Sequence, residues 1–312
     1  MADRSPELIE RAAARLRRPA PQDQGENSRA LRNAMQDAGA VPLDANHANG
    51  VASDPPHAAR AGRPLHEDVV SISQTTLASH GIALPSSGTS RTVEEFRALK
   101  REVIANIART RDASTGLSNR IVLVTSANPG EGKTFTATNL ALALASEKDT
   151  HVLLMDADAY RQSMLGYLGI FAEKGWLDFV SEKSARLGEL ILHTNLPNFS
   201  VLPAGKERDQ IPELISSSRM ADLFEQLMSE DPARLVVVDA VPCLTSTEPS
   251  ILAGLAGQTL FVVAAHETAQ DQIEASLRLL KASPRVNLML NKMHPVLTDH
   301  FKGYGYTYGA QR

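Results

Sequence analysis

Aromatic side chains are scarce in this chain of 312 residues, and they are unevenly placed. Phe, Trp and Tyr make up 4% of the chain, none occurs before Phe96, and three of the five tyrosines lie within the last nine residues. The single cysteine, Cys243, excludes an intramolecular disulfide and agrees with a reducing compartment. The formal net charge of -4 excludes a strongly basic nucleic-acid binder, so we expect no nucleic-acid partner.

Long apolar runs are also missing. No stretch approaches the roughly 18–20 uninterrupted apolar residues that a membrane-spanning helix needs. The N-terminus has no apolar region of the kind that a secretory signal contains. We therefore expect a cytoplasmic protein, whose association with a membrane would come from a partner or from a surface helix.

Residues 1–91 are predicted to form a low-complexity, mostly disordered extension. They hold eight of the 17 prolines, ten arginines, ten acidic residues and no lysine. A segment without large side chains to bury gains too little free energy to offset its chain entropy. The exception is residues 5–18, where a helix start precedes apolar residues at helical spacing, and both a docking helix and a solvated helix fit this pattern. Residues 69–84 are a second, weaker apolar island.

The folded domain is predicted to span residues 92–295. Residues 92–95 have the pattern of a capping box, and apolar residues at helical spacing follow them from Phe96 onward. Apolar runs then alternate with helical patterns, and the expected strands are 121–125, 151–155, 199–202, 235–238, 259–264 and 286–290. Buried strands separated by helices are typical of a parallel sheet covered on both faces. We therefore expect an α/β three-layer sandwich with a mostly parallel central sheet.

The strongest motif is a phosphate-binding loop, Ala127-Asn-Pro-Gly-Glu-Gly-Lys-Thr134, which follows an apolar run and opens a helical pattern. Its glycines let backbone N–H groups surround phosphate oxygens, Lys133 reaches the β- and γ-phosphates, and the Thr134 hydroxyl ligates Mg²⁺. The usual first glycine is replaced by Ala127, so the loop should differ slightly there. The expected nucleotide-binding residues are Asn128, Pro129, Gly130, Glu131, Gly132, Lys133, Thr134 and Phe135.

Acidic residues follow two of the expected strands. Asp156 and Asp158 come after the strand at 151–155, and Asp239 comes after the strand at 235–238. In parallel α/β sheets ligands bind at the carboxyl ends of the strands, which is where the phosphate loop also lies. We expect Thr134, Asp156 and Asp239 to hold Mg²⁺, and Lys133, Asp156 and Asp158 to be catalytic. Whether Asp156 or Asp158 serves as the metal ligand or as the base stays open.

Three further residues carry weaker signals. Asn291 ends the last expected strand, where it would contact adenine or act as a turn residue. Trp176 is expected in the core. Cys243 lies near Asp239, but no histidine partner marks it as a nucleophile.

These motifs together resemble the bacterial tyrosine kinases, which are P-loop proteins. The resemblance rests on the phosphate loop, on Asp156-Ala-Asp-Ala-Tyr-Arg161 and on Asp239 followed by Pro242, and it spans about residues 92–312. Residues 8–13, 95–101, 201–205 and the Gly–Tyr tail are similar to one subgroup, the tyrosine autokinases of exopolysaccharide and exosortase (PEP-CTERM) loci.

The resemblance implies an ATP- and Mg²⁺-dependent protein-tyrosine kinase that acts in trans on its own C-terminal tail, residues 296–312. The implied acceptors are Tyr304, Tyr306 and Tyr308. It also implies a homo-oligomeric ring, a membrane polysaccharide co-polymerase that recruits the kinase to the inner face of the cytoplasmic membrane, and a tyrosine phosphatase. The ring-forming ExxRxxR motif of the family corresponds here to Glu94, Arg97 and Lys100.

The chain departs from the family pattern at several positions. Gln162 stands where the family has proline, Ala240-Val241 precede Pro242, and Tyr160 replaces a smaller residue beside Asp158. The alternative function is an ATPase switch of the MinD/ParA type. Asn128, in place of the lysine that this group carries in the loop, and the Gly–Tyr tail both favour the kinase.

Overall fold

The computed structural model describes residues 69–84, 90–109, 119–182, 184–206 and 210–293. The predicted helix at 5–18 and the tail with Tyr304, Tyr306 and Tyr308 lie outside these ranges.

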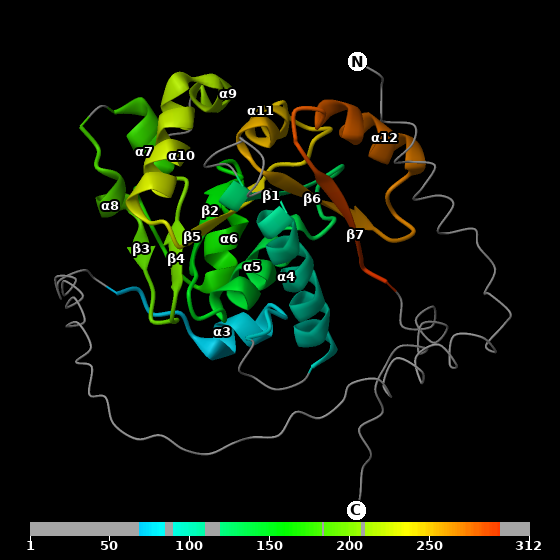
Figure 1. Cartoon of the computed structure of the whole chain (residues 1–312), viewed down its shortest axis with the longest axis horizontal. Coiled ribbons are helices and arrows are strands. Elements are labelled where there is room, and N and C mark those ends of the chain that lie inside the picture. The colour runs from blue at the N-terminus through cyan, green and yellow to red at the C-terminus, as the bar shows by residue number, and fades with distance from the viewer. Residues whose placement is uncertain (1–68, 85–89, 110–118, 183, 207–209, 294–312) are drawn as a thin grey trace, which may run out of the picture. The chain divides into compact units, whose positions relative to one another are not determined.

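A seven-stranded sheet with the order β3-β4-β2-β5-β1-β6-β7 forms the centre of the fold (Figure 1). All neighbouring strands are parallel except β3, which pairs antiparallel with β4. The six predicted strands are all present, and only the two-residue β3 was not expected, because so short an element has no recognisable pattern. The strands are β1 (Ile121–Ser126), β2 (His151–Ala157), β3 (Leu192–His193), β4 (Phe199–Leu202), β5 (Arg234–Ala240), β6 (Gln258–Ala264) and β7 (Val286–Asn291).

Helices cover both faces of this sheet, which confirms the three-layer sandwich (Figure 1). Neighbouring residues of β1 point to opposite faces, so that Leu123 belongs to one core cluster and Val122 and Val124 to the other. One face carries α3 (Gln74–Ser79), α4 (Arg91–Arg109), α5 (Lys133–Ala145) and α6 (Ser163–Leu168). The other carries α7 (Trp176–Ser181), α8 (Leu187–Leu190), α9 (Ile211–Ser216), α10 (Ser218–Glu230), α11 (Glu248–Leu255) and α12 (Gln270–Leu279).

Residues 69–84 are part of this fold, although the sequence pattern assigned them to the extension. Ile72, Leu77 and Ile82 are buried in the core on the α5 face. The side chain of Asn139, from α5, accepts a hydrogen bond from the Ala83 N–H at 2.9 Å. The folded domain therefore begins near residue 69, because this short apolar segment finds its partners only in distant elements.

Helix α4 begins one residue before the predicted capping box. Ser90 Oγ accepts the N–H of Val93 at 3.3 Å, so Ser90 caps the helix and Thr92 lies within its first turn. The predicted box at 92–95 is therefore wrong in register.

Within the described ranges, neither α4 nor any other helix is long and apolar enough to cross a membrane.

Candidate active site

The phosphate loop connects β1 to α5 at the carboxyl edge of the sheet. Gly130 and Gly132 have φ angles of +83° and +96°, which other residues adopt only with strain. A Cβ atom on Gly132 would also lie 2.1 Å from the Asn291 amide nitrogen, so any side chain here would require the Asn291 amide to move. Ala127 is buried and has no positive φ, so alanine introduces no strain of this kind there.

Glu131 turns its carboxylate into the protein rather than toward the loop opening. It is 3% exposed, and its oxygens accept hydrogen bonds from the Asn128 N–H at 3.0 Å, the Asn128 amide at 3.1 Å and the Thr268 hydroxyl at 2.6 Å. Gln272, in the first turn of α12, accepts a further bond from the Asn128 amide at 3.0 Å. These hydrogen bonds to Thr268 and Gln272 link the phosphate loop to the connection between β6 and α12. The sequence motif alone does not reveal this link.

Three carboxylates gather beside the loop, as predicted. Asp156 and Asp239 are directly opposite each other in the register of β2 and β5, and both are fully buried. Asp158 is 2% exposed, and its Oδ2 lies 3.1 Å from the Lys133 ammonium nitrogen. Asp156 Oδ2 and both oxygens of Asp239 accept no hydrogen bond from any described residue.

The environment disfavours negative charge on two of these carboxylates. Burial, reinforced by the charge of Asp239, raises the pKa of Asp156 well above its usual value. Burial also raises the pKa of Asp239 to about 7, although the Lys133 ammonium and the nearby Thr134 hydroxyl lower it. Neither Asp239 oxygen has a donor in hydrogen-bonding geometry among the described residues, so the Lys133 ammonium offsets the effect of burial only in part.

These unpartnered oxygens fit a hard divalent cation such as Mg²⁺, which prefers carboxylate and hydroxyl ligands. The described residues contain no ready group of three or more acidic, histidine or cysteine ligands for a metal. Mg²⁺ is commonly held by one or two carboxylates together with substrate phosphates, so a nucleotide would complete such a site. The Thr134 hydroxyl, 3.3 Å from Ser163 Oγ, lies near Asp239.

Two residues outside the motifs hold the acidic segment in place. The Trp176 indole donates to the Asp156 carbonyl at 2.7 Å, so the only tryptophan of the chain supports a site residue as well as the core. Gln162 has a φ of +46°, and its side-chain amide donates to the Gly205 carbonyl at 2.7 Å. A proline ring, which locks φ near -65°, could not adopt this conformation.

The remaining predicted nucleotide contacts lie in different surroundings. Asn291 donates to the Glu131 carbonyl at 2.9 Å, so it packs against the phosphate loop. The rings of Phe135 and Phe96 pack edge-on, with their centroids 6.0 Å apart, in the core on the α5 face of the sheet. The Phe135 side chain therefore packs against α4. Pro129 is exposed at the tip of the loop.

The predicted oligomerisation residues lie along α4. Glu94 and Arg97 form an ion pair one turn apart. Lys100 pairs with Glu147 at 2.6 Å and also donates to Ser146 at 3.1 Å, just beyond the end of α5. Lys100 is therefore engaged within the domain rather than held ready for a neighbouring copy.

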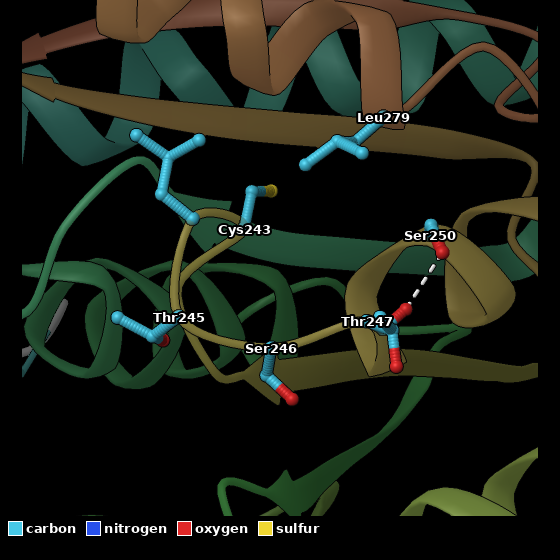
Figure 2. Close-up of a pocket in the computed structure, with 7 residues that line it drawn as sticks. Cys243, Thr245, Ser246, Thr247, Ser250 and Leu279 are labelled. Carbon is cyan, nitrogen blue, oxygen red and sulfur yellow. Dashed lines mark hydrogen bonds between the residues drawn. The ribbon is translucent and has the colours of Figure 1, made fainter.

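A cavity of about 290 Å³ lies on the connection that follows β5 (Figure 2). The N–H groups of Cys243 and Leu244 donate to the carbonyls of Ser126 and Ala127, so this connection rests on the start of the phosphate loop. Burial raises the pKa of the Cys243 thiol to about 11, which keeps it protonated and agrees with the absence of a nucleophile signal. The lining residues are Cys243, Leu244, Thr245, Ser246, Thr247, Ser250 and Leu279.

No protein-family profile matches the chain. Among solved structures, the VpsO kinase domain has a TM-score of 0.52 and 26% identity, covering 66% of this chain and all of that domain. Among curated proteins, the tyrosine-protein kinase ptk of Acinetobacter johnsonii is 29% identical over 196 residues, which are 62% of this chain and 25% of ptk.

The tyrosine-protein kinase CpsD of Streptococcus agalactiae is 30% identical over 219 residues, which are 67% of this chain and 92% of CpsD. The chain thus spans a quarter of one relative and nearly all of another. The chain belongs to the family of bacterial tyrosine-protein kinases.

Proposed function

We propose that this protein is an ATP-dependent tyrosine autokinase that phosphorylates Tyr304, Tyr306 and Tyr308 of a neighbouring copy and so regulates exopolysaccharide synthesis or export. The observation that carries the proposal is the pairing of Lys133 with Asp158 beside two buried carboxylates, Asp156 and Asp239, that have three oxygens without a hydrogen-bond donor among the described residues. The names of the relatives and the Gly–Tyr sequence of the tail agree with it.

ATP binding would rest on the phosphate loop. The backbone N–H groups around Gly130 and Gly132, at the start of α5, are suited to phosphate oxygens. Glu131 carries a negative charge in the same loop, which would repel ATP if it faced the phosphates. Its three hydrogen bonds hold that charge away from the loop opening.

Lys133 and Asp158 would change partners when ATP binds. The Lys133 ammonium contacts Asp158 at 3.1 Å, and the phosphates of ATP offer it a stronger negative charge. Once Lys133 turns to the phosphates, Asp158 is free to accept a proton. In the transfer, the tyrosine oxygen forms a bond to the γ-phosphorus, the bond from that phosphorus to the bridging oxygen breaks, Asp158 takes the phenol proton, and ADP leaves.

Asp156 and Asp239 would hold Mg²⁺ together with Thr134. When bound, this ion neutralises charge on the transferring phosphate. The hydrogen bond from Trp176 keeps Asp156 in position for this role, and the Asp158 N–H donates to Asp156 Oδ1 at 3.1 Å. This arrangement favours Asp158 as the base and Asp156 as the metal ligand, the choice that the sequence left open.

Phosphopeptide mass spectrometry on the purified full-length chain incubated with Mg-ATP tests the proposal. Phosphate is expected on Tyr304, Tyr306 or Tyr308, and Lys133→Met should remove it. ATP hydrolysis without phosphotyrosine would contradict the proposal and favour an ATPase switch. Persistence of the phosphate in the Lys133→Met chain would mean that another kinase added it.

A mixing experiment tests transfer between copies. The Lys133→Met chain keeps its tail tyrosines but lacks the phosphate-binding lysine, and a second chain with the three tail tyrosines changed to phenylalanine keeps the site but lacks acceptors. Phosphate on the Lys133→Met chain in the mixture would establish transfer in trans. Its absence, with each chain folded, would restrict transfer to a single chain.

Oligomerisation and membrane recruitment belong to the same proposal. Glu94 and Arg97 of α4 would contact a neighbouring copy in a ring, while Lys100 is held by Glu147. A membrane polysaccharide co-polymerase would bring the otherwise cytoplasmic kinase to the membrane, and a tyrosine phosphatase would reverse the reaction. Sedimentation of the Arg97→Ala chain, which should shift toward smaller species than the wild type, tests the ring contact.

A further inference from the structure

Tyr160 lies beside the catalytic carboxylates and has no role in the steps above. It follows Asp158 by two residues, in a tight turn closed by hydrogen bonds from the N–H groups of Arg161 and Gln162 to the Asp158 carbonyl at 3.2 and 3.0 Å. The residue is 50% exposed, an unusual position for a large aromatic ring in a chain with few aromatics.

The hydroxyl end of Tyr160 is anchored. It donates to Glu248 Oε1 at 3.1 Å, and Glu248 is 1% exposed at the first turn of α11. The other oxygen of Glu248 accepts no hydrogen bond from the described residues. Burial of the phenol oxygen and the adjacent Glu248 carboxylate raise the pKa of Tyr160 to about 12, so the hydroxyl stays protonated as a donor.

This hydrogen bond joins the segments that follow two neighbouring strands. Tyr160 comes after β2, which carries Asp156, and Glu248 comes after β5, which carries Asp239. The ring therefore spans the two connections on either side of the acidic pair. Tyr160 is thus a half-exposed aromatic ring two residues from Asp158, and it is held at its hydroxyl end.

We propose that the Tyr160 ring is a contact surface for the aromatic ring of the acceptor tyrosine, and that Glu248 positions it. The inference rests on the proposed tyrosine-kinase function and adds a specificity determinant to it. Aromatic rings attract one another in offset or edge-on geometry beyond what their buried area provides. The site would then prefer an aromatic acceptor before any chemistry occurs.

Binding of two unreactive peptides tests this inference. Both carry residues 303–312 of the tail, one with phenylalanine and one with leucine in place of each tyrosine. They are titrated into the full-length chain, in the presence of Mg²⁺ and a non-hydrolysable ATP analogue. The tail tyrosines of that chain are replaced by leucine, so that it supplies no competing ring. The phenylalanine peptide should bind about 2- to 10-fold more tightly than the leucine peptide.

The Tyr160→Ala chain should lose this preference. Tyr160→Phe keeps the ring but loses the hydrogen bond to Glu248, so it should retain only part of the preference. Phe171→Ala is the matched control, because Phe171 is a 79% exposed aromatic residue in the next loop, between α6 and α7. An unchanged ratio of the two affinities in Tyr160→Ala would overturn the inference. If that chain does not fold, Tyr160→Leu makes the same comparison with the apolar bulk kept.

The outcomes separate the inference from the proposed function. If the wild-type chain phosphorylates the natural tail peptide but Tyr160→Ala keeps the preference for phenylalanine, only the inference fails. If no tyrosine is phosphorylated although nucleotide binds, the proposed function fails.

Discussion

Two kinds of buried acid lie at the same phosphate loop: Glu131, which belongs to the loop, and the strand-end carboxylates, of which Asp239 is the clearest case. Their hydrogen-bonding surroundings differ. Glu131 accepts three hydrogen bonds from Asn128 and Thr268. Asp239 is equally buried and accepts none from the described residues. A carboxylate whose oxygens are satisfied stabilises the fold, whereas one left without donors destabilises it until a positive ligand arrives. The comparison indicates that Glu131 stabilises the loop, and it agrees with our proposal that Asp239 holds Mg²⁺.

The largest expected effect concerns the pH dependence of stability. The folded chain holds the Asp239 proton up to a pH of about 7, whereas the unfolded chain releases it near the usual value of 3.8. The free energy of unfolding should therefore fall as pH rises between these values, by about 4 kcal/mol for this group alone without Mg²⁺ and nucleotide. Urea titrations of the wild type and Asp239→Asn from pH 4 to pH 8 measure the difference, and equal slopes would contradict it.

The second prediction concerns activity. Asp239→Asn should lower the rate of phosphotyrosine formation by about 10²–10³-fold, since the amide holds a cation poorly. The same chain should be more stable than the wild type at pH 8, because a buried unpaired charge is gone. Single-turnover assays at saturating Mg-ATP measure the loss, with the exposed Asp222→Asn as the matched control. Near-normal activity of Asp239→Asn would remove Asp239 from the metal site.

The third prediction is that substitution of Glu131, whose oxygens are hydrogen-bonded, lowers stability, whereas Asp239→Asn raises it at pH 8. Glu131→Gln should destabilise the chain by about 1–3 kcal/mol, since one of its three donors would then face an amide N–H instead of an oxygen. Urea unfolding of Glu131→Gln beside Asp239→Asn gives the contrast directly. If both changes shifted stability in the same direction, the distinction between the two sets of acids would be lost.

The smallest expected effect is at Thr268. Thr268→Val removes the hydroxyl that donates to Glu131 and also accepts the Ala264 N–H at 3.0 Å. We expect a loss of about 1 kcal/mol in stability and a few-fold rise in the KM for ATP, with a smaller change in kcat. Thr268→Ser keeps the hydroxyl and should restore the KM. A KM unchanged in both variants would mean that the hydrogen bond between Thr268 and Glu131 does not affect the conformation of the phosphate loop.

The sequence predicted which acids and which lysine lie together at the sheet edge, but not the residues that hold them in position. The loop motif and the acids at strand ends identified Lys133, Asp156 and Asp239 because each follows or opens an element with a clear apolar pattern. Thr268 and Trp176 could not be found in this way. Thr268 is 137 residues from Glu131, and no local spacing links an isolated threonine to a glutamate so far away.

Local patterns therefore determined the α/β class, six of the seven strands and the edge of the sheet where the acids gather. Strand and motif signals are short-range, so they survive in the sequence alone. Tertiary structure decided which acids are satisfied and which are not, that Lys133 rests on Asp158, and that residues 69–84 belong to the domain. Each of these depends on atoms that the chain brings together only when the sheet and its helices have formed.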